Sequence, residues 1–141
     1  MRFMLLVYPE GFDAAAPDFA PPHEAVAAMM KFNEELQAAG VLLSLDGLHP
    51  PSMGARIHYG QGVPRVTRGP FPGKDAVGGY WMIRTASLDD AIDWMKRCPM
   101  HGKTVVEIRQ VFEMEEYPED VQRAAGDARV GLRETLQQQE D

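Results

Sequence analysis

The sequence predicts an α+β domain in which one antiparallel sheet carries two helices. Residues 3–8 are apolar at both alternate sets of positions, which is typical of a strand that is covered on both faces. Residues 23–39 carry apolar side chains at helical spacing, and so does the shorter stretch 88–97. Strand-like segments precede and follow each helix, so each half of the chain reads strand, helix, strand.

Local signals fix where the helices begin and end. Pro22 suits the first turn of a helix, and Gly40 is the expected residue after its last turn. Ser87 with Asp90 resembles a capping box, and Pro99 ends the second helix. The other strands are expected at 41–48, 56–59, 64–67, 77–85 and 103–114. The order β-α-β-β-β-β-α-β predicts a ferredoxin-like layer with both helices on one face.

Such a layer leaves its second sheet face open to water. Residues 3–8 and 80–83 are nevertheless apolar on both faces. Burying one large apolar side chain contributes about 1.5–3 kcal/mol, so exposing several of them is costly. We therefore expect a homodimer with C2 symmetry, in which two sheets face each other and close a dimeric α/β barrel.

Composition limits the class of partner. Of the 141 residues, 45% are apolar and 25% charged, as in a globular domain, and no apolar run approaches the ~20 residues of a membrane span. The net charge of −7 is uneven, because residues 1–112 hold 12 acids and 11 bases whereas residues 113–141 hold 9 acids and 3 bases. This balance argues against nucleic acid or an anionic membrane as partner. We expect a domain at 1–114 and an acidic, partly helical tail at 115–141.

Cysteine usage and the first residues indicate location. Cys98 is alone, so no internal disulfide is possible, which fits a reducing cytoplasm. The apolar start of six residues is too short for a signal peptide. We expect a cytoplasmic protein.

Three residues are candidates for acid–base chemistry. Asp46 and His49 follow the second strand and could orient one another as an acid–base pair. His23 stands at a helix start, where the dipole disfavours the imidazolium and leaves a neutral base. The alternative for both histidines is an unengaged residue in a loop or at a helix end.

Five residues are candidates for ligand binding, namely His23 together with Tyr8, Arg68, Phe71 and Tyr80. Arg68 could clamp a carboxylate or phosphate, which makes a small organic acid a possible partner. Tyr8 and Tyr80 could line a cleft between the helices and the sheet, and Phe71 could add an aromatic wall. The alternatives are a surface charge for Arg68 and core packing for the three rings. The four histidines are scattered and no cysteine pair exists, so we expect neither a metal site nor a cofactor.

Several ordered motifs resemble one protein family. They are Phe3–Tyr8, Leu36–Leu42 with Gly47–Pro50, Arg68–Phe71 with Gly78–Ile83, Ser87–Ala91 with Trp94, and Val106–Arg109. Together they resemble the YCII-related proteins, specifically the DGPF branch, over roughly residues 1–114. The resemblance implies a dimeric α/β barrel and a bacterial origin. Arg68 stands here in place of the acid of the DGPF motif.

Three functions remain open. The first is a small-molecule binding protein without catalysis. The second is a cofactor-free lyase, isomerase or hydrolase that uses Asp46 and His49 on a small anionic substrate. The third is a protein-interaction module, because members of the branch are associated with sigma factors.

Overall fold

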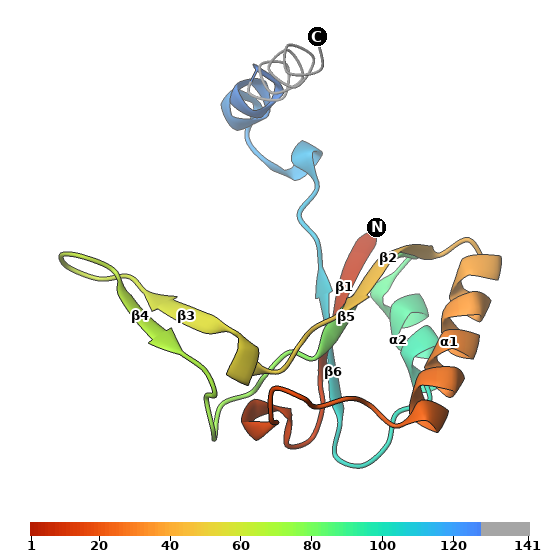
Figure 1. Cartoon of the computed structure of the whole chain (residues 1–141). Coiled ribbons are helices and arrows are strands. Elements are labelled where there is room, and N and C mark those ends of the chain that lie inside the picture. Colours follow the sequence, from red (N-terminus) through yellow and green to blue (C-terminus); the bar gives the residue numbers. More distant parts are fainter. Residues whose placement is uncertain (128–141) are drawn as a thin grey trace, which may run out of the picture. The chain divides into compact units, whose positions relative to one another are not determined.

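The computed structural model describes residues 1–127 and divides the chain into a first unit, Met1–Val111, and a second that begins at Phe112. The first unit is built on a four-stranded sheet with the order β2-β5-β1-β6, in which every neighbouring pair is antiparallel. The strands are β1 (Arg2–Tyr8), β2 (Leu42–Gly47), β5 (Gly79–Arg84) and β6 (Val105–Gln110). The helices α1 (His23–Ala38) and α2 (Leu88–Lys96) lie together on one side of the sheet (Figure 1). This arrangement confirms the α+β, ferredoxin-like layer.

The alternation along β1 separates the two faces of the sheet. Phe3, Leu5 and Val7 are buried, whereas the residues between them are only half-buried. The buried set packs with residues of both helices and of β5, namely Phe32, Leu36, Trp81, Ile83 and Ala91. This is the helix face of the sheet and holds the core.

The opposite face, which we call the open face, carries the other half of each strand. Its centre is apolar, with Met4 and Leu6 on β1 directly opposite Met82 and Tyr80 on β5. Polar side chains lie at its two edges, where Asp46 of β2 stands opposite Tyr80, and Glu107 of β6 stands opposite Leu6. The strands are thus apolar on both sides at the centre of the sheet, as the sequence predicts.

The helix boundaries follow the expected signals. Pro22 precedes α1, and Gly40 has a left-handed φ of 72° just after its end. The amides of Gly40 and Val41 donate to the carbonyls of Gln37 and Leu36, which closes the last turn. Ser87 Oγ accepts the Asp90 amide at 3.1 Å and so caps α2.

The two middle strands do not join the main sheet. β3 (Ala55–His58) and β4 (Arg65–Arg68) form a separate two-stranded hairpin. At its base, the Gly69 amide donates to the Gly54 carbonyl at 2.9 Å, and the Gly69–Pro70 peptide bond is cis. A Cβ on Gly69 would collide with the Pro51 carbonyl, so only glycine fits at this position.

Three short 3-10 helices also lie within the described residues: η1 (Phe12–Ala14), η2 (Pro51–Met53) and η3 (Met114–Glu116). The last strand, expected at 103–114, ends at Gln110. In the second unit, the Glu113 amide donates to the Glu116 carboxylate at 2.7 Å, which is one of the two hydrogen bonds of a capping box at the start of η3. Met114 is therefore part of this turn and not of the last strand.

Residues 119–127 are helical, and the rest of the expected tail, 128–141, lies outside the described residues. Among residues 1–127, no helix is long and apolar enough to cross a membrane.

Candidate functional site

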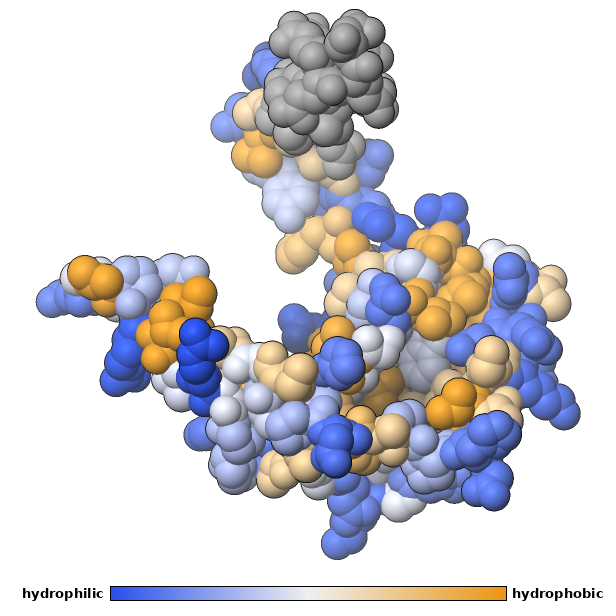
Figure 2. Space-filling model, in the orientation of Figure 1, coloured by the Kyte–Doolittle hydropathy of each residue, from blue (hydrophilic) through white to orange (hydrophobic). Residues whose placement is uncertain are grey.

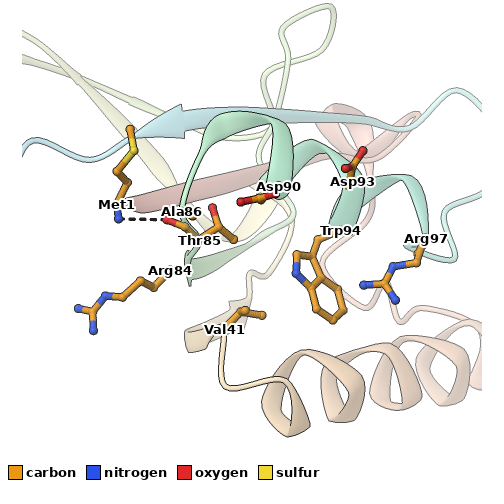
Figure 3. Close-up of a pocket in the computed structure, with 9 residues that line it drawn as sticks. All are labelled: Met1, Val41, Arg84, Thr85, Ala86, Asp90, Asp93, Trp94 and Arg97. Atoms are coloured by element: carbon orange, nitrogen blue, oxygen red, sulfur yellow. Dashed lines mark hydrogen bonds between the residues drawn. The ribbon is translucent and has the colours of Figure 1, made fainter.

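The described residues form two notable cavities. The larger, about 570 Å³, lies beside the end of β5 and α2. Figure 3 shows that Arg84 and Arg97 stand at opposite ends of it, with Asp90 between them. Arg97 is engaged with the face of the Trp94 ring, 3.8 Å from its centroid. Because its charged groups do not converge on one point, this cavity is a weak candidate for a specific site.

The smaller cavity, about 340 Å³, lies at the C-terminal end of β1. Three chain segments meet there: the turn after β1, the loop before β5, and the loop and start of β6. Its polar lining residues are Tyr8, Glu10, Asp13, Lys74, Asp75, Lys103 and Glu107. Polar groups from distant parts of the sequence therefore converge on this cavity, which makes it the candidate site.

Tyr8 and Glu107 form the centre of the site. The Tyr8 hydroxyl donates to Glu107 Oε2 across the β1–β6 pair, at 3.5 Å. The guanidinium of Arg109 lies 3.8 Å from the same carboxylate oxygen. Desolvation raises the pKa of Tyr8 above its ordinary value of 10.0, and the charges of Glu107 and Asp75 raise it further. At neutral pH the phenol is therefore protonated, and it acts as a donor toward Glu107.

Two other carboxylates hold the walls of the cavity in place. Glu10 Oε2 accepts the Lys103 amide at 3.2 Å, which ties the turn after β1 to the loop before β6. Asp13 Oδ2 accepts the Gly73 amide at 2.7 Å, which ties η1 to the loop before β5. Both acids lie at the cavity but also have a structural partner.

The lining is acidic on balance. Four carboxylates, those of Glu10, Asp13, Asp75 and Glu107, stand against the two ammonium groups of Lys74 and Lys103. The lining thus has a formal excess of two negative charges, which the Arg109 guanidinium beside Glu107 reduces to one, and this balance favours a ligand that is cationic or donates hydrogen bonds.

The structure joins only part of the expected acid–base group. Asp46 Oδ2 accepts from the Tyr80 hydroxyl at 3.1 Å, across the β2–β5 pair. His49 is exposed in the loop after β2, and no hydrogen bond connects it to Asp46 in the described part of the chain. The expected Asp46–His49 pair is therefore not formed, because Asp46 points from the open face toward Tyr80 instead.

The two tyrosines lie on the open face, which differs from the expected cleft between helices and sheet. Tyr8 alternates with the buried Val7, and Tyr80 alternates with the buried Trp81, whose ring faces α1. Since alternate side chains of a strand point to opposite faces, both phenols lie away from the helices. Tyr8 lines the smaller cavity, but Tyr80 does not.

The other expected ligand residues lie elsewhere in the first unit. Arg68 is exposed at the end of β4, and His23 is exposed at the first position of α1. Phe71 packs under the guanidinium of Arg56, which lies 4.0 Å from its ring centroid. Phe71 thus supports the base of the hairpin, the packing role that the sequence left open.

Sequence reasoning missed most of the lining of the cavity. Glu107 carried one usable signal, because it alternates with the apolar Val106 and Ile108 and so had to face away from the core. Lys74, Asp75 and Lys103 lie in loops without periodicity, and only the strand order brings these loops together.

Cys98 is not part of this site. Its sulfur lies 4.0 Å from the Met29 sulfur, and desolvation raises its pKa to about 11. The thiol therefore stays protonated at neutral pH. Within residues 1–127, no group of histidine, cysteine and acidic side chains could hold a metal ion.

Comparison with known proteins identifies the domain. Residues 1–115 match the model of the YCII-related domain. No curated protein sequence matches the chain significantly. Among solved structures, the chain is similar to 5-chloro-2-hydroxyhydroquinone dehydrochlorinase (TftG) from Burkholderia phenoliruptrix AC1100, in a complex with 2,5-dihydroxybenzoquinone. The two share 16% sequence identity with a TM-score of 0.42, over 83% of this chain and 100% of the other.

Proposed function

We propose that this protein, which belongs to the YCII-related family, binds a small organic amine in the cavity beside Tyr8. The observation that carries the proposal is the convergence of Tyr8, Glu107 and Asp75 on a cavity of about 340 Å³. That volume suits a compound of one ring or a short chain. The Glu107 carboxylate accepts hydrogen bonds only, so it requires a donor on the ligand.

The charge of the lining selects the ligand class. An amine meets an excess of carboxylates, whereas an organic acid would be repelled by them. Arg68, which motivated the organic acid, is exposed on the hairpin and does not line this cavity. An organic acid remains the competing ligand, and its site would be at Arg68.

Catalysis is the alternative function. The expected acid–base pair lacks its hydrogen bond, since Asp46 accepts from Tyr80. Tyr8 with Glu107 is a second donor–acceptor pair, but the raised pKa of Tyr8 makes it a weak acid at neutral pH. Binding is therefore the function that the geometry supports best.

Titration calorimetry with matched ligands tests the proposal. Benzylamine, benzyl alcohol and benzoate share one ring and differ in the charge of the polar group. We expect benzylamine to bind about tenfold or more tightly than benzoate, and Glu107→Gln to weaken benzylamine by about tenfold. Tyr80→Phe is the control, because Tyr80 also donates to a carboxylate on the open face but lies outside the cavity.

The opposite ranking would contradict the amine. If benzoate binds most tightly and Arg68→Ala abolishes its binding, the organic acid is the ligand. If none of the three compounds gives heat at millimolar concentration, the cavity is not a binding site for small ring compounds.

The open face supports a homodimer. Met4, Leu6, Tyr80 and Met82 form an apolar centre that is only half-buried within the first unit. Placing a second copy on this face, with C2 symmetry, would complete the expected dimeric α/β barrel and bury that centre. Sedimentation equilibrium measures the assembly directly. A mass near 31 kDa is expected, about twice the 15.7 kDa of one chain, and a mass of one chain at micromolar concentration would contradict the dimer.

Two finer assignments are also proposals. Membership of the DGPF branch is supported by Gly69, Pro70 and Phe71, which form the compact base of the hairpin, while Arg68 departs from the motif of that branch. A cytoplasmic location is supported by the single, protonated Cys98.

A further inference from the structure

The β3–β4 hairpin has one anchored face and one uncovered face. Cross-strand partners share a face, so Ile57 and Val66 lie together on one side, and Arg56 and Thr67 lie on the other. Arg56 anchors its side to the domain, through the ring of Phe71 and a hydrogen bond at 3.5 Å to the Asp75 carbonyl. Ile57 is 53% exposed and Val66 is 58% exposed. The outward face of the hairpin is therefore apolar and has no cover.

This apolar face is unusual for a hairpin that stands alone. A two-stranded hairpin is marginally stable in water unless its apolar face packs on another surface. Figure 2 shows apolar residues on the hairpin next to strongly hydrophilic ones. Residues 55–68 contain three arginines and no acid, and Arg68 lies on the Ile57–Val66 face, because its cross-strand partner is Ala55. A surface that covers this face would thus combine apolar side chains with acidic ones.

The open face has an apolar centre with the acids Asp46 and Glu107 at its edges, and it also carries Arg2, Arg84 and Arg109, of which Arg109 lies beside Glu107. Within one protomer, however, the hairpin is a sheet of its own and does not pair with the four-stranded sheet. Figure 1 shows that it extends from the sheet on the side opposite the helices, which is the side of the open face. A second copy that covers the open face would therefore lie alongside the hairpin.

The area of the sheet leaves room for this contact. Four strands spaced about 4.8 Å apart, with about six residues each, present roughly 400 Å² of flat area. A stable interface buries about 800 Å² on each partner. The accessible surface of side chains exceeds the flat area beneath them, and a contact made by the hairpin would add to the surface that the four strands bury.

We propose that the β3–β4 hairpin is a clasp that holds the second copy in the dimer. Its Ile57–Val66 face packs on the second copy, and Arg68, which lies on the same face of the hairpin, faces Asp46 at the edge of that copy's open face. By C2 symmetry each protomer gives one clasp and receives one. The clasp rests on the homodimer proposed above, and it assigns a function to the segment that interrupts the ferredoxin-like order.

Sedimentation equilibrium of a paired variant tests the clasp. Ile57→Ser with Val66→Ser removes the apolar face of the hairpin. Val26→Ser with Met30→Ser is the matched control, because these α1 residues are 38% and 61% exposed and lie on the helix side of the domain. We expect the dimer dissociation constant of the hairpin variant to rise by about tenfold or more, and that of the control to stay within about twofold.

Hydrogen exchange of the unmodified protein gives a second readout, which does not depend on how the variant folds. Amides of residues 55–68 are expected to exchange more slowly above the dissociation constant than below it. The clasp alone would be overturned if the wild-type protein is a dimer, the hairpin variant dimerises with the same dissociation constant, and the exchange of residues 55–68 does not change with protein concentration. A wild-type monomer would overturn both the dimer and the clasp.

Discussion

The indole N–H of Trp81 donates to Asn33 Oδ1 at 2.8 Å, which ties β5 to α1 through a polar contact beside the core. The same ring meets Phe32 edge-on, with centroids 6.1 Å apart. Trp81 is 5% exposed, so its N–H would lose its partner if Asn33 were changed. This contact lies on the face of β5 that meets the helices, and Tyr80 lies on the opposite face.

We expect Trp81 and Asn33 to contribute jointly to stability. Trp81→Phe removes the donor and part of the ring, and it should lower the free energy of unfolding by about 1–3 kcal/mol. A double-mutant cycle with Asn33→Ala should give a coupling energy of about 1 kcal/mol. Urea unfolding of the four proteins measures it. Additive effects of the two changes would show that the hydrogen bond adds nothing to stability.

Gly69→Ala is expected to disturb the base of the hairpin. The new Cβ would collide with the carbonyl of Pro51, a backbone group that cannot turn aside, and the cost should be about 2 kcal/mol. Gly60→Ala is the control, because a Cβ there would meet nothing within 4 Å. Thermal unfolding compares the two variants. Equal melting temperatures would contradict the close approach of Gly69 to Pro51.

Tyr8 should ionise later than an ordinary tyrosine. The pKa of Tyr8 is raised in the folded protein, so the unfolded chain loses this proton first, near pH 10. The stability that the neutral phenol contributes is present below that pH. It is lost as the pH rises through the pKa of the folded protein. Absorbance at alkaline pH should show that Tyr8→Phe removes a late-titrating phenol. Above about pH 10, the free energy of unfolding of Tyr8→Phe should also fall less steeply with pH than that of the wild-type protein. If the phenol that disappears from the titration of Tyr8→Phe is one that ionises near pH 10, the pKa of Tyr8 is not raised.

Cys98 should react slowly with thiol reagents in the folded protein. With a pKa of about 11, the thiol is almost entirely protonated at pH 8, and only the thiolate is nucleophilic. The rate of alkylation should rise about tenfold for each pH unit up to about pH 10. Mass spectrometry of iodoacetamide-treated protein follows this rate. A fast reaction that levels off near pH 8 would show that the thiol is not desolvated.

The fold could be predicted from the sequence because its signals are local. The alternation of β1, the glycine at position 40 and the Ser87 cap each act within a few residues. The end of the last strand could not be predicted from apolar alternation alone. The strand stops at Gln110, and the Glu113–Glu116 cap begins a new turn three residues later. The two short strands of the hairpin could be predicted, but that they form a sheet of their own could not, because strand pairing depends on the whole fold.

The candidate site was harder to predict than the fold. Tyr8 was identified because it is an aromatic residue at the end of an apolar strand, but its face of the sheet depends on which residues the helices cover. Asp46 and His49 are near in sequence, yet the pleat directs Asp46 toward Tyr80. Glu10 and Lys103 are 93 positions apart, and only the folded loops bring them together.

The most direct test of the proposed binding site is where the ligand binds. Two-dimensional ¹H–¹⁵N NMR of the labelled protein, titrated with benzylamine, reports the amides that sense the compound. The account predicts shifts around Tyr8, Lys103 and Glu107, with Tyr8→Phe and Glu107→Gln reducing them and Tyr80→Phe leaving them unchanged. Shifts confined to the cavity at Arg84 and Trp94 would contradict it.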